Sequence, residues 1–321
     1  MLEVVQLKVV RRLVLSSLLA LLMSPQASAA QKPTPVGEQF QVNTFTLQEQ
    51  LASAVGPDGA GGFVIAWTSN DGYYHYQYAS ADIMAQRYAL DGSPVGGEFR
   101  VNTESADPWI PLYHKWPDMA SDGHTGFRVV WQSRGSDESG SPSSNRSIRG
   151  RRYAADGMPI GLEFQVNSYT TGDQTGARIG SDGGDGFVVT WSSEGSYWSD
   201  SSDRSIQGQR YVADGSPLGD EFQVNTYTTD NQWGATANPD GAGGFVIVWY
   251  SVGSYGTDDG GSIQGQRYAT DGTRIGKQFQ VNTSTGGNQS NPEVGPDGAG
   301  GFVVVWDSDD SNGSDSDGDS I

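Results

Sequence analysis

The sequence repeats itself, and this repetition is the feature that most limits what the chain can fold into. Residues 205–225 read SIQGQRYVADGSPLGDEFQVN, and residues 262–282 read SIQGQRYATDGTRIGKQFQVN. Alignment of the chain with itself gives five copies of one unit, each with a tryptophan that closes an apolar run. These tryptophans are Trp67, Trp131, Trp191, Trp249 and Trp306. Such periodicity is typical of an array of small structural units that pack on one another.

The intervals within the unit distinguish framework from loop. From the arginine of each Arg-Tyr pair to the phenylalanine of the next F-x-V-N segment the distance is 12 residues in all four cases. From the tryptophan to the next such arginine it varies between 18 and 21 residues. Constant intervals indicate a hydrogen-bonded framework, and the variable interval indicates a surface loop. The second copy also carries an insertion, which we place at residues 104–115.

Each unit has the pattern of four short strands. A weak first strand precedes an Asp-Gly turn, as at residues 292–295, and the second strand is an apolar run such as residues 301–306. The SIQGQRY and FQVN segments are the third and fourth strands. Because the second strand is apolar on both faces, it must lie in a sheet that is covered on both sides.

The hairpin around Asp214-Gly215 has a predictable loop length. For Gly208 and Phe222 to share one face of the sheet, the loop must contain an odd number of residues. We therefore expect a three-residue loop with Gly215 in the left-handed conformation, and not the commoner two-residue Asp-Gly turn.

The predicted fold is all-β. Forty-five glycines and frequent turn signals suit tightly joined strands and not amphipathic helices. Four antiparallel strands per unit, with a doubly buried inner strand, predict a β-propeller of four-stranded antiparallel blades. The alternative is a linear β-repeat array. A fourth-strand segment at residues 40–43 precedes the first complete unit, and a ring can use such a strand to complete its last blade. We expect the tryptophans to pack in the core and the Arg-Tyr pairs to bridge neighbouring units.

The N-terminus has the layout of a secretory signal peptide. Lys8, Arg11 and Arg12 precede the apolar residues 13–23, and small residues follow up to Ala30. The apolar run is too short for a permanent membrane helix. We therefore expect a signal peptide at residues 1–30, a repeat domain at residues 31–321, and export to the periplasm, the cell surface or the medium.

The other end of the sequence falls within a repeat. Ser320 and Ile321 are the residues that begin the third strand in earlier units, as at Ser205 and Ile206. We therefore expect the last unit to be truncated and the natural protein to continue.

The charge of the chain limits its partners. The net charge is −19 at pH 7, and residues 1–30 carry one acidic and three basic residues, so their removal leaves −21. Nucleic acids and anionic membranes would be repelled by such a protein. The chain contains no cysteine, which excludes disulfides, thiol redox chemistry and thiolate metal sites.

The unit resembles the tandem repeats of large secreted bacterial surface proteins, whose pattern runs FQVNT, GGFVVTW, a Gly/Ser/Asp-rich loop and GQRYDADG. The resemblance covers residues 37–321, and the first two copies depart from it most, since residues 83–86 read IMAQ where later copies read SIQGQ. In such proteins the repeats are often accompanied by haemolysin-type calcium-binding or cadherin-like modules. The resemblance implies no defined activity, and the chain contains no nonapeptide calcium repeat.

The acidic loop at residues 307–319 has two interpretations. Its carboxylates could supply oxygen ligands for calcium, although the glycine spacing differs from that of an EF-hand. A solvated polar loop is the other interpretation. The candidate calcium ligands are Asp307, Asp309, Asp310, Asp315, Asp317 and Asp319.

Aromatic residues that do not recur in every copy are candidates for ligand binding, because the repeat framework does not explain them. Aromatic rings beside polar groups can stack on sugars. Packing under long loops is the alternative role. The candidates are Trp109, Tyr113, Trp116, Tyr197, Trp198 and Tyr255.

No catalytic motif is present: the three histidines have no metal-ligand spacing, and there is no GxSxG or HExxH sequence. We therefore expect no enzyme, with no catalytic residue to name. The predicted function is a secreted or cell-surface binding or adhesion module for carbohydrate or an extracellular protein. A calcium-stabilised structural spacer is the alternative, and a polysaccharide hydrolase or lyase is the third hypothesis.

Overall fold

The computed structural model describes residues 38–46, 49–70, 81–103, 113–122, 126–134, 146–195, 204–253 and 260–309. The chain divides into two units, Met1–Glu38 and Gln39–Ile321, and all of the strands below belong to the second. The signal peptide predicted at residues 1–30 is outside the described residues. Within these residues every regular element is a β-strand, so no helix is found that could span a membrane.

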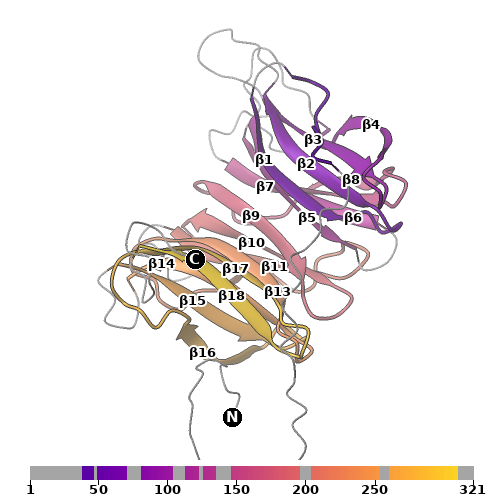
Figure 1. The fold of residues 1–321 in the computed structure, drawn as a ribbon. Helices are drawn as coiled ribbons and strands as arrows, with labels where there is room; N and C mark the ends of the chain where they lie inside the picture. The colour runs from indigo at the N-terminus through magenta and orange to yellow at the C-terminus, as the bar shows by residue number, and fades with distance from the viewer. Residues whose placement is uncertain are drawn as a thin grey trace, which may run out of the picture. The chain divides into compact units, whose positions relative to one another are not determined.

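The strands follow the sequence repeat, and Figure 1 shows the sheets succeeding one another from the indigo β1 to the yellow β18. The first strands of repeats 1 to 5 are β1 (Gln50–Pro57), β5 (Tyr113–Ser121), β9 (Gln174–Ser181), β13 (Gln232–Pro239) and β17 (Gln289–Pro296). The second strands are β2 (Phe63–Asn70), β6 (Gly126–Arg134), β10 (Phe187–Glu194), β14 (Phe245–Val252) and β18 (Phe302–Ser308). The third strands are β3 (Ala81–Tyr88), β7 (Arg146–Ala154), β11 (Arg204–Tyr211) and β15 (Gly261–Tyr268). The fourth strands are β4 (Pro94–Arg100), β8 (Pro159–Gln165), β12 (Phe222–Gln223) and β16 (Arg274–Gln280).

Within repeats 1 to 4, each strand pairs antiparallel with the next in sequence, and β17 pairs antiparallel with β18. One parallel pair of residues, Ala81 and Tyr113, links β3 to β5. The first strands of successive repeats pack beside one another, which is how blades are arranged in a β-propeller. The prediction of an all-β propeller of four-stranded antiparallel blades is confirmed.

The hairpin between the third and fourth strands has the predicted geometry. Gly215 has a φ of 87°, and its N–H donates to Val212 O at 2.9 Å. Val212 N–H in turn donates to Ser216 O at 3.0 Å, which leaves three residues in the loop. Gly208 lies opposite Phe222 in the ladder, on the expected face.

The hydrophobic core is divided into four clusters, and each cluster lies between two consecutive repeats. In the third cluster, Val188 and Ile206 of repeat 3 pack with Ala237, Ile247 and Trp249 of repeat 4. We call the surface that a repeat turns toward the next one its trailing face, and the surface that it turns toward the previous one its leading face. The recurrent tryptophans belong to the leading faces; the first four are buried as expected, and Trp306 is partly exposed.

The Arg-Tyr pairs bridge neighbouring repeats, as predicted. The Arg87 guanidinium donates to Asp58 of its own repeat at 3.1 Å and to the carbonyl of Asp156 in repeat 2 at 2.9 Å. The Tyr153 hydroxyl of repeat 2 donates to the Val101 carbonyl of repeat 1 at 3.0 Å.

The segment that precedes the first complete repeat packs on the leading face of repeat 1. The rings of Phe40 and Tyr88 have centroids 5.2 Å apart, and the Tyr88 hydroxyl donates to Val42 O at 3.1 Å. Phe222 and Tyr268 form the corresponding contact between repeats 3 and 4. Residues 40–43 therefore occupy the position that a preceding repeat's fourth strand has elsewhere; the completion of a last blade stays a prediction.

Candidate functional site

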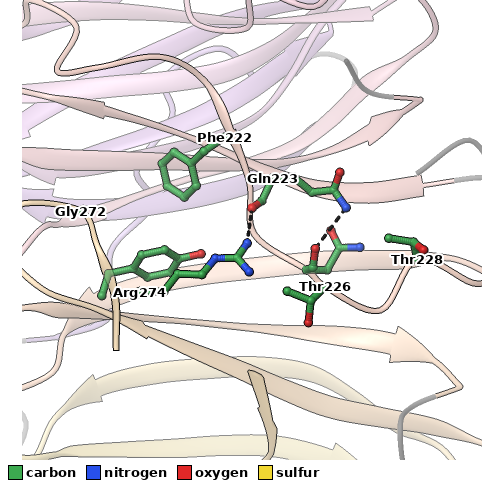
Figure 2. A pocket seen from close by; sticks show the side chains of 8 residues that line it. Phe222, Gln223, Thr226, Thr228, Gly272 and Arg274 are labelled. Carbon is green, nitrogen blue, oxygen red and sulfur yellow. Dashed lines mark hydrogen bonds between the residues drawn. The ribbon is translucent and has the colours of Figure 1, made fainter. Parts of the chain in front are cut away.

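A groove of about 480 Å³ lies where repeat 3 meets repeat 4 (Figure 2). One wall is the end of repeat 3, and the other comes from β15 and the hairpin that follows it. The residues that line the groove are Phe222, Gln223, Asn225, Thr226, Thr228, Tyr268, Gly272 and Arg274. It thus combines two aromatic rings with amide groups, hydroxyl groups and one guanidinium.

The wall from repeat 3 is held in place by side chains. Asn225 Oδ1 accepts a hydrogen bond from Ile206 N–H at 2.8 Å, and its amide nitrogen donates to Tyr227 O at 2.7 Å. Both the backbone N–H and the hydroxyl of Thr226 donate to Gln278 Oε1 of repeat 4, at 2.8 and 2.9 Å. The first of these bonds continues the contact with β11 past the last residue of β12, and the bonds to Gln278 fix this wall of the groove against repeat 4.

Arg274 distinguishes this groove from the corresponding positions between the other repeats. It donates from Nη2 to Gln223 O at 2.6 Å and to Val224 O at 3.0 Å, and Figure 2 shows it directed at the repeat 3 wall. At the corresponding place the other complete repeats have proline: Pro94, Pro159 and Pro217. A guanidinium has five N–H donors, so Arg274 retains donors for a ligand beyond those that these two bonds use.

An equivalent groove of about 620 Å³ lies between repeats 2 and 3. Phe164 and Tyr211 supply its rings, Pro217 stands in place of the arginine, and Glu221 stands in place of Gln278. The Ser168 N–H and hydroxyl donate to Glu221 Oε2 at 2.6 and 2.8 Å. The same architecture therefore recurs along the chain with a different charge.

The hydrogen bonds from a serine or threonine of one repeat to a carboxylate or amide of the next were not predicted from the sequence, although the sequence contains a pattern that marks them. A carboxylate or amide residue directly precedes each fourth-strand phenylalanine, and its side chain accepts a hydrogen bond from the threonine or serine that directly follows the preceding F-x-V-N segment. The pairs are Glu98 with Thr44, Glu163 with Thr103, Glu221 with Ser168, and Gln278 with Thr226.

Two predicted ligand-binding aromatics lie in a strand and not in an insertion. Pairing with β6 begins at Tyr113, so residues 113–115 are part of β5, and the placement of the insertion at residues 104–115 was wrong at this end. Trp116 is exposed, and its N–H donates to Thr68 Oγ1 of repeat 1 at 3.1 Å. Trp109, Tyr197, Trp198 and Tyr255 are outside the described residues, so their role stays a prediction.

Trp116 occupies a β-bulge that recurs in every first strand. The residues at this position all have positive φ, although three of them are not glycine; they are Ala52, Trp116, Gly176, Gly234 and Asn291. Next to this bulge in repeat 4, Trp233 is partly exposed, and its ring centroid is 4.5 Å from that of Tyr250. Non-glycine residues in this conformation cost energy and are found disproportionately at functional sites.

Charged side chains from three repeats meet over the first strands. Arg178 of β9 is 3.9 Å from Glu293 of β17. Asp118 of β5 accepts a hydrogen bond from Ile179 N–H at 2.9 Å. Burial raises the pKa of Asp118, and this hydrogen bond and the charge of Arg178 only partly offset the rise.

The predicted calcium ligands are described only in part. Asp307 lies in β18 and accepts a hydrogen bond from the Asn291 amide at 2.8 Å, and Asp309 follows the strand. The other four, Asp310, Asp315, Asp317 and Asp319, are outside the described residues. Among the residues that the structure describes, no group of three or more His, Cys, Asp or Glu side chains could hold a metal ion. Calcium binding stays a prediction.

No protein family and no curated protein matches the sequence. Solved structures do match in fold. The Hadza microbial sialidase Hz136 is 11% identical with a TM-score of 0.52 over 82% of this chain and 53% of the sialidase. A protein of unknown function from Dyadobacter fermentans is 12% identical with a TM-score of 0.55, over 85% of this chain and 76% of that protein. The chain spans about half the length of the sialidase, and at these identities the likeness concerns the fold alone.

Proposed function

We propose that the chain is a carbohydrate-binding module that acts outside the cell and that the groove between repeats 3 and 4 is its binding site. The observation that carries the proposal is the lining of this groove, where the partly buried ring of Phe222 lies among hydroxyl and guanidinium groups such as those of the exposed Thr226 and Arg274, while the ring of Tyr268 is buried. Sugars are bound by this combination, because a ring covers the apolar face of the sugar and polar groups bond its hydroxyls. A β-propeller fold shared with a sialidase supports the same ligand class.

The test is glycan-array binding by the full chain, followed by titration of the best ligand with an Arg274→Pro variant. Proline is the native residue at this position in repeats 1 to 3, so the fold should keep its melting temperature. We expect the affinity to fall at least tenfold, which corresponds to about 1.4 kcal/mol.

The control is Lys277→Gln, which removes an exposed positive charge of β16 that does not line the groove. Equal losses of affinity in both variants would indicate a general electrostatic effect. Unchanged binding in Arg274→Pro would exclude this groove, and the absence of binding to every glycan would overturn the proposed function.

A polysaccharide hydrolase is the second candidate, and the charged cluster of the first strands favours it. A carboxylic acid with a raised pKa, such as Asp118, can act as a general acid, and Glu293 supplies a second carboxylate. Release of reducing ends from a polysaccharide by the full chain, with loss of that activity in Asp118→Asn, would support this function. Without turnover the cluster has a structural role.

A further inference from the structure

The hairpin that forms one wall of the groove between repeats 3 and 4 differs in charge from the other three hairpins that join a third strand to a fourth. Residues 271–278 carry two basic side chains and one acidic side chain. Residues 214–221 carry three acidic and no basic side chains, and residues 91–98 and 156–163 each carry two acidic and no basic ones. The hairpin of repeat 4 therefore attracts anions locally, although the chain as a whole, with a net charge of −19, repels them.

Three positions of the hairpin account for this reversal of charge. Its acidic residue, Asp271, closes the turn by accepting hydrogen bonds from the N–H and the hydroxyl of Thr273, at 2.8 and 2.7 Å, as the corresponding aspartate does in repeat 1. The differences are Arg274 in place of proline, Lys277 in place of glycine, leucine or aspartate, and Gln278 in place of glutamate. Each of the three makes the hairpin more positive.

The contact between repeats does not require Gln278. At the interface of repeats 2 and 3, Glu221 accepts hydrogen bonds from the N–H and the hydroxyl of Ser168, the same two bonds that Gln278 accepts from Thr226. The carboxylate and the amide therefore have the same structural role and differ in charge. Because a hydrogen bond to a carboxylate is the stronger of the two, the stability of this contact does not explain the glutamine.

Stability does not explain Arg274 either. The hydroxyls of Tyr88 and Tyr153 donate to the valine carbonyl of the preceding F-x-V-N segment, at 3.1 and 3.0 Å. At this interface the corresponding carbonyl, Val224 O, accepts from Arg274, and the buried hydroxyl of Tyr268 makes no hydrogen bond with the described residues. Burial raises the pKa of that hydroxyl to about 12, and the nearby charge of Arg274 only partly offsets the rise. A buried hydroxyl without a partner lowers stability.

The guanidinium of Arg274 has donors available on the groove side. Both of its hydrogen bonds leave from Nη2, so they use neither Nε nor Nη1. Arg274 is exposed, and none of the eight residues that line the groove is acidic. The groove between repeats 2 and 3 is lined instead by Asp220 and Glu221 and by no basic residue. Two grooves of one architecture thus have opposite charge, and only the first suits an anionic ligand.

We propose that the groove between repeats 3 and 4 selects an acidic sugar and that Arg274 donates to a carboxylate or sulfate group of this ligand. The inference rests on the proposed carbohydrate-binding function and names the class of carbohydrate. A guanidinium binds the paired oxygens of such groups through two parallel N–H donors. Lys277 is exposed but does not line the groove, so it adds to the attraction without contacting the ligand.

Calorimetric titration of the full chain with three oligosaccharides of equal length tests the proposal. The three are an oligogalacturonate, which carries carboxylates, a carrageenan oligosaccharide, which carries sulfates, and a neutral galactan oligosaccharide. We expect one of the acidic ligands to bind about tenfold more tightly than the neutral one, and the tighter of the two identifies the anionic group. This preference should shrink as NaCl is raised from about 50 to 500 mM, because salt screens the charges.

Gln278→Glu tests the role of charge without removing a group that lines the groove. Glutamate is the native residue at the other three interfaces, so the melting temperature should not change. We expect the affinity for the acidic ligand to fall about tenfold, because a negative charge now lies beside the bound anion. The matched control is Leu162→Glu, which adds a negative charge at an exposed residue of the hairpin in repeat 2 and should leave this affinity unchanged.

The outcomes separate this inference from the function on which it rests. A neutral oligosaccharide that binds as tightly as both acidic ones would overturn the choice of an acidic sugar and leave the carbohydrate-binding function standing. Equal affinities of Gln278→Glu and Leu162→Glu for the acidic ligand would do the same. If none of the three oligosaccharides and no glycan of an array binds, the inference and the proposed function are both wrong.

Discussion

Arg267 holds Asp240 through two hydrogen bonds, from Nη2 at 2.7 Å and from Nε at 3.2 Å, with the carboxylate fully buried. The other oxygen of Asp240 accepts from the N–H groups of Ala242 and Gly244, at 2.9 and 3.0 Å. One carboxylate therefore closes the turn after the first strand and positions the third strand of the same repeat. The same ion pair joins Asp58 to Arg87 and Asp182 to Arg210.

We expect Asp240→Asn to lower the free energy of unfolding by about 3 kcal/mol at pH 7, because it leaves a largely buried guanidinium without its partner charge. Burial opposes ionisation of Asp240, but the bonds from Arg267 and the turn outweigh it and hold its pKa below 3.8. A lowered pKa gives stability that is present above the ordinary value and lost as the pH falls through the folded value. The variant should therefore lose less stability than the native chain below pH 3.8. Urea unfolding at several pH values measures both effects.

Asp297→Asn is the matched control for this prediction. Asp297 makes the same turn bonds, to Ala299 and Gly301, but its side chain is exposed. The change should cost less than about 1 kcal/mol. Equal losses in the two variants would show that the turn, and not the ion pair, carries the stability.

His114 should make the protein sensitive to mild acid. It replaces a glutamine that bonds the indole N–H of the tryptophan in three other repeats, as Gln174 does for Trp191 at 2.9 Å. Both ring nitrogens of His114 and the indole N–H of Trp131 are buried and have no hydrogen-bond partner among the residues that the structure describes. Burial, with the charges of Arg149 and Arg100, lowers the pKa of His114 to about 4.

The unfolded chain takes up a proton at His114 near pH 6.5, and the folded chain does so only near pH 4. Stability is therefore lost as the pH falls between these values, by about 3 kcal/mol. We expect His114→Gln to abolish this loss and to add about 1 kcal/mol by bonding Trp131. The reciprocal Gln174→His should introduce the same dependence into repeat 3. Parallel melting-temperature profiles of native and His114→Gln protein from pH 7 to 4 would refute the assignment.

Substitution of two glycines of repeat 4 by alanine should lower the free energy of unfolding by different amounts. A Cβ on Gly244 would lie 2.1 Å from the backbone oxygen of Tyr268, which the sheet holds in place. A Cβ on Gly265 would meet only the tip of the Phe279 ring, at 2.7 Å. Repeat 1 already has Ala85 opposite Phe99 at this second position. We expect Gly244→Ala to cost about 3 kcal/mol and Gly265→Ala less than about 1 kcal/mol in chemical denaturation; the reverse order would contradict this account.

The candidate site was only partly accessible from the sequence. The aromatics that stood out in the variable loops are mostly outside the described residues, and Trp116 lies in a strand. The groove between repeats is built from framework residues such as Phe222 and Tyr268, whose recurrence indicated packing alone. The departure that matters was visible, since Arg274 stands where three repeats have proline. The role of Arg274 in the groove could not be predicted from the sequence, because the carbonyl groups to which it donates belong to the preceding repeat.

The strand order, the three-residue hairpin at Gly215 and the bridging role of the Arg-Tyr pairs were predictable from the amino-acid sequence. These features follow from intervals and alternation, which are local properties of the chain. The three-dimensional structure was needed to show that each core cluster of the described residues lies between two repeats, and that Val303 is exposed whereas Val188 and Val246, at the same position of β10 and β14, are buried. Burial depends on what lies opposite a side chain, and near-identical local sequences cannot encode that difference.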